Sequence, residues 1–375
     1  MAQTAQAEVR TVTLREAEKS IRRAMRRKRP VFVWGPPGIG KSDLMWQITD
    51  TFVNGLLIDL RMALMEPTDL RGIPYYNQAL NTMSWAPPVD LPSAEQAAEH
   101  DVIILFLDEL NSAPMATQAA AYQLILNRRI GTYHLPENVV IVAAGNRETD
   151  RGVTYRMPSP LANRFVHIEV AADFDVWQEW AVEHQVHPDV LGYLTFAKND
   201  LYNFDPGSNE RSFATPRSWV FVSELLRDEE GDPEMVESEI TDLVAGTVGE
   251  GLAVKFNAHR KHSGKLPNPS DILDGTVTKL EVKEVSAMYS LTISMCYELR
   301  DAYKKAKKQN PGKEWHAMCD NFFRFMMDNF LTEVTVMGAK MALTNYNLPL
   351  VPGKLKSFDE FHKRFGKYVI SAMEG

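Results

Sequence analysis

The stretch of the sequence that most constrains the fold is Gly35-Pro36-Pro37-Gly38-Ile39-Gly40-Lys41-Ser42. It satisfies the pattern G-x-x-x-x-G-K-[ST], which forms a loop around the phosphate tail of a nucleotide. The apolar run at residues 31–34 predicts a strand before it, and residues 43–52 predict a helix after it. Because the motif requires a strand, the loop and a helix in this order, the sequence predicts a phosphate-binding loop in an α/β domain.

The residue types in this loop suit an anion. Phosphate oxygens accept hydrogen bonds from main-chain N–H groups at the start of a helix. Pro36 and Pro37 have no N–H group, and glycine at 35, 38 and 40 allows the backbone to approach an anion closely. We expect Lys41 to reach the outer phosphates and the Ser42 hydroxyl to hold Mg²⁺. The expected main-chain donors are Gly38, Ile39, Gly40, Lys41 and Ser42.

Polar side chains follow two other apolar runs. Residues 102–107 predict a strand buried on both faces that ends at Asp108 and Glu109, and residues 139–144 predict another that ends at Asn146. Open α/β sheets bind ligands at the carboxyl ends of their strands. We expect Asp108 to hold the water shell of Mg²⁺ and Glu109 to polarise an attacking water as a general base. The Asn146 amide is expected to donate to the γ-phosphate or to orient that water.

The order of elements predicts an α/β fold. Strands are predicted at 31–34, 56–60, 102–107, 139–144 and 166–170. Their alternation with helices predicts a doubly wound parallel five-stranded P-loop sheet. The nucleotide-binding domain that contains this sheet is expected to span residues 1–172. Residues 61–94 are expected to be a long irregular excursion, either a contact loop or a surface excursion without a role. Residues 128–138 have hairpin character around Gly131.

The composition changes after residue 172, where only helices are predicted, at 175–184, 216–227 and 234–256. The predicted organisation is an α-helical lid at 173–260, a linker at 261–271 and a helical C-terminal extension at 272–375. Arg217 follows the helix start Thr215-Pro216, where a cation opposes the helix dipole. A nearby nucleotide phosphate would offset that, so Arg217 is a candidate phosphate contact. No pattern indicates a role for residues 266–375.

The overall charge and the cysteines limit the binding partners and the cellular location that can be expected for the protein. The net charge of −8 gives no general attraction to nucleic acid or to an anionic membrane. The predicted first helix, residues 14–28, is nevertheless basic, so it is either a solvated face or a patch for nucleic acid or an acidic partner. Cys296 and Cys319 indicate no disulfide framework, and no apolar run approaches the ~18 residues of a membrane span. We therefore expect a cytoplasmic location and no membrane contact.

Four segments together resemble the AAA+ ATPases and, within them, the MoxR-type branch. The resemblance covers residues 10 to about 260. The segments are Gly35 to Ser42, Leu107-Asp108-Glu109-Leu110-Asn111, Ala144-Gly145-Asn146-Arg147-Glu148 and Leu161-Ala162-Asn163-Arg164-Phe165.

This resemblance implies ATP with Mg²⁺ and a role for each matching position. Lys41 and Ser42 would belong to Walker A, and Asp108 and Glu109 to Walker B. Asn146 would be sensor 1, Arg217 sensor 2, and Arg164 the arginine finger that reaches a neighbour's nucleotide. The family usually has Asn-Pro at sensor 1, whereas this chain has Asn146-Arg147. The role of Arg147 therefore stays open.

The resemblance also implies a ring, expected to be a hexamer, that remodels or activates a protein client as a MoxR-like chaperone. Such rings commonly work with a von Willebrand factor A-domain protein. Residues 61–94 would be the insert that faces the ring pore, and residues 128–138 the hairpin before sensor 1. The client and the oligomer number stay open.

Two other functions are compatible with the sequence. A nucleic-acid-associated AAA+ motor is supported by the basic first helix and opposed by the net charge. A nucleotide-gated scaffold that binds ATP but hardly hydrolyses it is opposed by the presence of both Glu109 and Arg164. ATP is preferred over GTP through the resemblance, and no Asn-Lys-x-Asp motif for guanine occurs.

Overall fold

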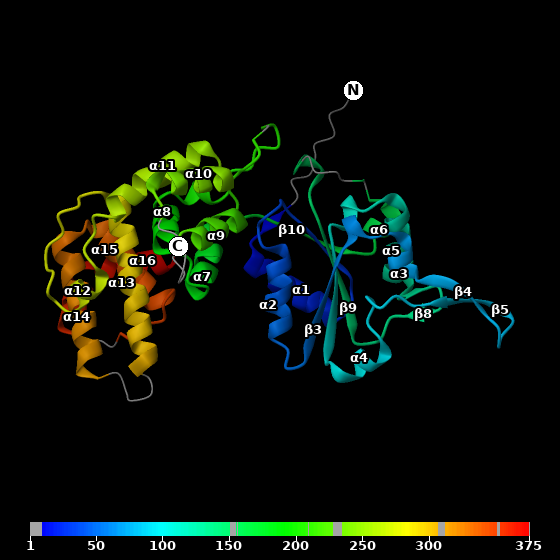
Figure 1. The fold of residues 1–375 in the computed structure, drawn as a ribbon. Coiled ribbons are helices and arrows are strands. Elements are labelled where there is room, and N and C mark those ends of the chain that lie inside the picture. The colour runs from blue at the N-terminus through cyan, green and yellow to red at the C-terminus, as the bar shows by residue number, and fades with distance from the viewer. Residues whose placement is uncertain are drawn as a thin grey trace, which may run out of the picture. The chain divides into compact units, whose positions relative to one another are not determined.

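The computed structural model describes residues 10–150, 155, 157–208, 210–227, 235–306, 312–350 and 353–374. Residue 234, the predicted start of a helix, lies outside them. The chain divides into two compact units (Figure 1). The first comprises residues 1–173 and 205–208, and the second comprises residues 174–204 and 209–375.

The first unit is built on a parallel sheet of six strands in the order β1-β10-β2-β9-β6-β3. The strands are β1 (Thr11–Val12), β2 (Val31–Trp34), β3 (Gly55–Arg61), β6 (Val102–Asp108), β9 (Val139–Gly145) and β10 (Val166–Val170). The predicted α/β class and its five strands are confirmed, but the strand number was wrong by one. The additional strand, β1, pairs with Glu169 and Val170 at the sheet edge. Two residues are too few to show the alternation by which a strand is predicted from sequence.

The centre of the sheet forms the core of the first unit. Every residue of β9 is buried, as are the last six residues of β6. Strands buried on both faces carry near-continuous apolar sequences. The helices of this unit are α1 (Leu14–Met25), α2 (Lys41–Asp50), α3 (Pro67–Arg71), α4 (Ala94–Glu99), α5 (Met115–Asn127) and α6 (Ser159–Ala162). Helix α1 begins with the predicted capping box, in which Thr13 and Glu16 exchange hydrogen bonds with each other's main chain.

The prediction that residues 61–94 form an irregular excursion was wrong. They contain the 3₁₀ helix η1 (Met62–Leu64), helix α3 and an antiparallel hairpin of β4 (Ile73–Asn77) and β5 (Thr82–Ala86). Most residues of this hairpin are exposed, so their sequence lacks the alternation of a half-buried strand. The hairpin extends away from the main sheet (Figure 1). The shorter hairpin predicted around Gly131 is confirmed as β7 (Arg129–Ile130) and β8 (Tyr133–His134).

The second unit is helical. Its elements are α7 (Phe174–Glu183), α8 (Pro188–Phe196), η4 (Lys198–Leu201), α9 (Pro216–Leu225), α10 (Glu237–Val248), α11 (Glu250–Ser263), α12 (Pro269–Leu273), α13 (Val285–Ala306), α14 (Lys313–Asn329), α15 (Thr332–Thr344) and α16 (Lys356–Glu374). The single helix predicted to end at residue 256 is two helices, because Gly249 has a positive φ of 97° between them. No helix in the described part of the chain is long and apolar enough to cross a membrane.

The predicted lid and the predicted C-terminal extension contribute to one hydrophobic core. Its buried residues run from Phe174 in α7 to Phe361 in α16. Part of the predicted linker is helical, since α11 reaches Ser263 and α12 begins at Pro269 with Ile272 buried. The boundaries of the lid, linker and extension stay predictions.

Candidate active site

The loop between β2 and α2 requires glycine at several positions. Gly38 and Gly40 have φ angles of 74° and 99°, in the left-handed region that other residues rarely adopt. A β-carbon on Gly35 would lie 2.7 Å from the Ile39 side chain and 2.8 Å from that of Val170. The tight path of this loop therefore depends on the glycines that the motif specifies.

Lys41 lies at the centre of the polar contacts in this loop. Its Nζ donates hydrogen bonds to the carbonyl oxygens of Gly35 at 2.7 Å and Pro36 at 3.0 Å. The same Nζ lies 3.2 Å from Oδ1 of Asn146 at the end of β9. The structure therefore brings together two predicted site residues that are 105 positions apart in the chain.

The predicted acids also lie beside the loop. The Ser42 hydroxyl donates to Oδ2 of Asp108 at 3.1 Å, and the Asp108 residue is buried. The Glu109 main-chain N–H donates to the other oxygen of Asp108 at 2.9 Å. Glu109 has a positive φ of 55°, which is uncommon for a residue other than glycine. Such strained backbone is concentrated at functional sites.

Two residues at the end of β3 were missed by the sequence analysis. Arg61 lies opposite Asp108 in the strand register, and its Nη1 is 2.9 Å from Asp108 Oδ2. Its Nη2 is 3.4 Å from Asp59. Burial raises the pKa of Asp59, the Arg61 guanidinium opposes the rise, and the Asp108 charge adds to it. The position of Asp59 and Arg61 at the carboxyl end of a predicted strand was the available signal.

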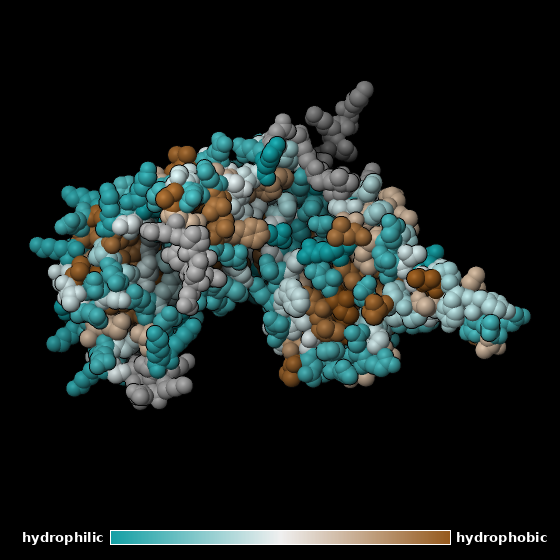
Figure 2. Space-filling model, viewed as in Figure 1, coloured by the Kyte–Doolittle hydropathy of each residue, from teal (hydrophilic) through white to brown (hydrophobic). Residues whose placement is uncertain are grey.

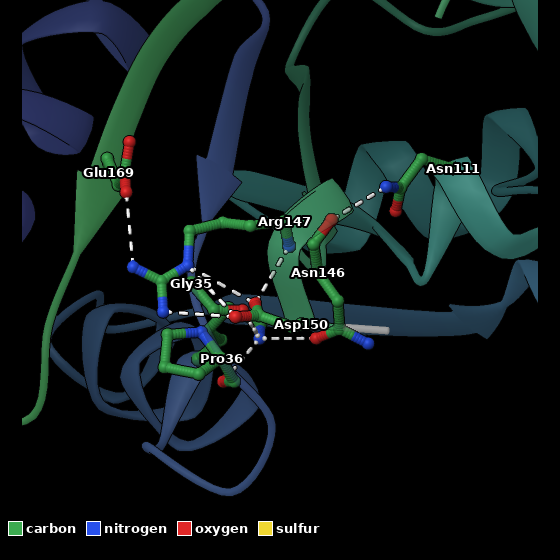
Figure 3. Close-up of polar contacts among 8 residues, drawn as sticks. Gly35, Pro36, Asn111, Asn146, Arg147, Asp150 and Glu169 are labelled. Atoms are coloured by element: carbon green, nitrogen blue, oxygen red, sulfur yellow. Dashed lines mark hydrogen bonds and ion pairs between the residues drawn. The ribbon is translucent and has the colours of Figure 1, made fainter. Parts of the chain in front are cut away.

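Asn111 was also missed, although it stands in a segment that carries the resemblance. Its Nδ2 donates to the main-chain oxygen of Asn146 at 2.8 Å (Figure 3). Its side chain is buried against Gly145, where a β-carbon would lie 2.1 Å from Asn111 Oδ1. The close contact between these two residues fixes the main chain immediately before Asn146.

Arg147 connects the end of β9 to two carboxylates (Figure 3). Its main-chain N–H donates to Asp150 at 3.0 Å, and its Nη2 lies 3.1 Å from the same carboxylate. Its Nη1 lies 3.3 Å from Glu169 on β10. Burial alone would lower the pKa of Arg147, but the hydrogen bonds and charges of Asp150 and Glu169 outweigh it and leave that pKa raised.

Neither of the two predicted arginines takes part in the contacts described so far. Arg164 is exposed and follows α6 in the first unit. Arg217 is exposed in the first turn of α9, in the second unit. Their assignments as arginine finger and sensor 2 stay predictions.

The donor set at this edge of the sheet fits magnesium. Ser42 and Asp108 offer hydroxyl and carboxylate oxygens, the ligand types that Mg²⁺ prefers. In nucleotide sites Mg²⁺ takes one or two protein oxygens, with phosphates and water completing its shell. Among the residues that the structure describes, no three His, Cys, Asp or Glu side chains gather as a complete metal-binding set.

A parallel α/β sheet, a glycine-dependent loop with Lys41 and Ser42, and an acid pair at the end of β6 define a P-loop nucleotide-hydrolysing fold. Residues 30–165 match the family model of the AAA domain (dynein-related subfamily). Residues 30–165 are therefore similar to AAA domains, and the chain is an ATP hydrolase. The match does not identify the MoxR branch.

Several solved structures are similar to the chain at low identity. A candidate ATPase from Cytophaga hutchinsonii is 14% identical over 89% of this chain and 81% of that chain, with a TM-score of 0.34. NtrX from Brucella abortus is 16% identical over 84% of this chain and 69% of that chain, with a TM-score of 0.39. No curated protein matches the chain. Similarity at this level does not extend the assignment beyond the AAA domain.

Proposed function

We propose that this protein is a ring-forming ATPase of the MoxR type that couples Mg-ATP hydrolysis to the remodelling or activation of a protein client. The proposal that the client is a protein rests on the β4–β5 hairpin. It exposes apolar and aromatic side chains, and no charged residue occurs between residues 73 and 86. Its exposed large hydrophobic residues are Ile73, Tyr75, Tyr76, Leu80 and Met83.

An exposed apolar hairpin suits a protein surface better than a nucleic acid. Aromatic residues and methionine are enriched at protein interfaces, and exposed apolar patches mark interaction sites. Binding to nucleic acid draws most of its affinity from lysine and arginine at phosphates, which this hairpin lacks. In Figure 2 the hairpin projects at the right of the view and is mostly pale and teal, with a few apolar residues coloured tan or brown along it.

The proposed chemistry follows from the positions of the side chains. Lys41 binds the outer phosphates, while Ser42 and Asp108 hold Mg²⁺, which when bound neutralises charge on the phosphates. Glu109 polarises the attacking water, a role worth about 10²–10⁴ in rate. The Asn146 amide, placed beside Lys41 Nζ, orients the γ-phosphate or the water.

Assembly into a ring is supported by the exposure of Arg164, which leaves its guanidinium accessible to a neighbouring copy. An arginine supplied in trans can contribute about 10³–10⁵ in rate. The hexameric number and the von Willebrand factor A-domain partner rest on the resemblance.

A nucleic-acid motor is the second candidate, and one observation favours it. Helix α1 and the turn after it expose a set of cations, which are Arg15, Lys19, Arg23, Arg26, Arg27, Lys28 and Arg29. The net charge of −8 opposes this alternative. Salt-sensitive stimulation of ATP turnover by DNA or RNA, with no stimulation by protein, would favour the motor.

The test uses the Glu109→Gln protein, which should retain ATP and hold its client during purification. A recovered client should stimulate ATP turnover of the unchanged protein. Replacing Leu80 and Met83 with serine should abolish that stimulation and leave basal turnover unchanged. Val53→Ser is the matched control, since Val53 is 94% exposed outside the hairpin. Equal stimulation in the hairpin variant would contradict the client contact.

A further inference from the structure

We propose that Arg147, Asp150 and Glu169 form a bridge across the start of the nucleotide loop, and that this Arg147 bridge positions Asn146. Arg147 is then a positioning residue for ATP hydrolysis. The inference rests on the role proposed above for the Asn146 amide.

The sheet order places the bridge over β2. Strand β2 lies between β9 and β10, with Trp34 opposite Gly145 on one side and Glu169 on the other. Trp34 is the last residue of β2, and the next N–H, that of Gly35, donates to Gly145 O at 3.2 Å. Because Arg147 follows Gly145 by two residues and reaches Glu169 at 3.3 Å, its side chain spans β2 where the loop begins.

Asp150 holds both the main chain and the side chain of Arg147. Its Oδ2 accepts from the Arg147 main-chain N–H at 3.0 Å, and both carboxylate oxygens lie 3.2 Å from Arg147 Nε. Asp150 is 6% exposed. These contacts make the turn after Asn146 rigid. The ion pair between Arg147 and Glu169 connects this turn to β10.

Asn146 is consequently held from several directions (Figure 3). Asn111 donates to its main-chain oxygen, and Lys41 Nζ lies at hydrogen-bond distance from its side-chain Oδ1. Lys41 is also the residue proposed to bind phosphate, so it is an unsuitable permanent anchor for the amide. The Arg147 bridge supplies an anchor independent of the nucleotide.

The sizes of the possible effects separate positioning from stability. The Arg147 and Glu169 side chains are 32% and 17% exposed, and partly exposed ion pairs contribute little to stability. A displacement of about 1 Å in a reacting group can lower a rate about 10²-fold. Loss of the Glu169 contact should therefore lower the ATP turnover rate clearly and change the melting temperature little.

The first experiment compares Glu169→Gln with Glu137→Gln in the full chain. Glu137 pairs with Lys28 in the same unit, is 90% exposed and serves as the matched control. We expect Glu169→Gln to lower kcat by about 10-fold or more while the Kd for a non-hydrolysable ATP analogue and the melting temperature stay at the control's values. Unchanged kcat, or a parallel loss of nucleotide affinity and melting temperature, would overturn the proposal.

The second experiment tests whether the bridge acts through Asn146. In an Asn146→Ala background, Glu169→Gln should lower kcat no further, because the side chain that it positions is gone. An equal loss in both backgrounds would refute positioning through Asn146. Arg147→Lys, which keeps the charge but loses the forked donor geometry, should reproduce the loss seen in Glu169→Gln. ATP turnover by the unchanged protein distinguishes failure of this inference from failure of the proposed function.

Discussion

The Ser42 hydroxyl donates a hydrogen bond to the Asp108 carboxylate over 3.1 Å, although the two residues are 66 positions apart. The phosphate-binding loop and the third predicted strand therefore meet at one edge of the sheet. Arg61 Nη1 lies 2.9 Å from the same carboxylate oxygen. The Asp108 carboxylate thus contacts both a hydroxyl group and a cation, and both contacts affect its ability to bind a metal ion.

We expect Asp108→Asn to raise the Mg²⁺ concentration needed for half-maximal ATP turnover by about 10-fold or more, because a carboxylate is a much stronger ligand for this cation than an amide. Titration of turnover with Mg²⁺ in the presence of excess ATP measures this. Asp90→Asn, at an exposed position of the same unit, is the control. An unchanged Mg²⁺ requirement would remove Asp108 from the metal site.

Mixing two inactive variants tests whether Arg164 acts on a neighbouring copy. Arg164→Ala and Glu109→Gln should each bind ATP and each lose about 10²-fold or more in turnover. Mixed assemblies should regain part of the activity, since an intact Glu109 in one copy then meets an intact Arg164 from another. Phosphate release across mixing ratios is the measurement. Lost ATP binding in Arg164→Ala would instead place that arginine at its own nucleotide.

The packing of α8 on α13 can be tested at Gly192. A β-carbon there would lie 2.1 Å from Ser290 Oγ and 2.8 Å from its Cα, so the helices must move apart. We expect Gly192→Ala to lower the free energy of unfolding by about 1–3 kcal/mol. Gly246→Ala is the control in α10, where nothing lies within 4 Å, and it should be neutral or stabilising by about 0.5–1 kcal/mol. Denaturant unfolding with two equally stable variants would rule out close contact between α8 and α13.

His259 should make the second unit sensitive to acid. Burial lowers its pKa from 6.5 to about 4, an effect that the nearby Asp189 charge opposes. Between these values the unfolded chain binds a proton that the folded chain does not, so stability is complete above pH 6.5 and falls as the pH drops toward 4.

We expect this fall to reach about 1.4 kcal/mol per pH unit. His259→Gln should flatten the dependence, because glutamine does not titrate and can still bond with Ser290, which lies 2.9 Å from the histidine ring. Thermal unfolding at several pH values measures the slope. His184→Gln, on the exposed surface of the same unit, is the control. Equal slopes in all three proteins would contradict the assignment to His259.

The main sheet was predictable because its signals are local. The strands around Phe106 and Val142 are continuous apolar runs, which are typical of strands buried on both faces. The β4–β5 hairpin was not predictable in this way. Its register brings Gly72 against the Ala86 carbonyl, where a β-carbon would lie 1.9 Å away, and that is a contact between distant residues.

The residues of the candidate site also fall into two groups, those that motifs predict and those that only contacts in the structure reveal. Lys41, Ser42, Asp108 and Asn146 could be named from their motifs, and the structure brings these four together. Arg61, Asn111 and Glu169 were not named, since the role of each depends on a contact with a residue on another strand or turn. Strand order is decided by packing and not by position in the sequence.

By itself the sequence determined the chemistry of the loop, since glycines and prolines restrict backbone angles residue by residue and Lys41 and Ser42 follow at fixed spacing. Only the tertiary structure decided that β9 and β10 lie on either side of β2 and that Arg147 reaches across to Glu169. The physical reason is that backbone preferences act over a few residues, whereas an ion pair between strands exists only after the sheet has assembled.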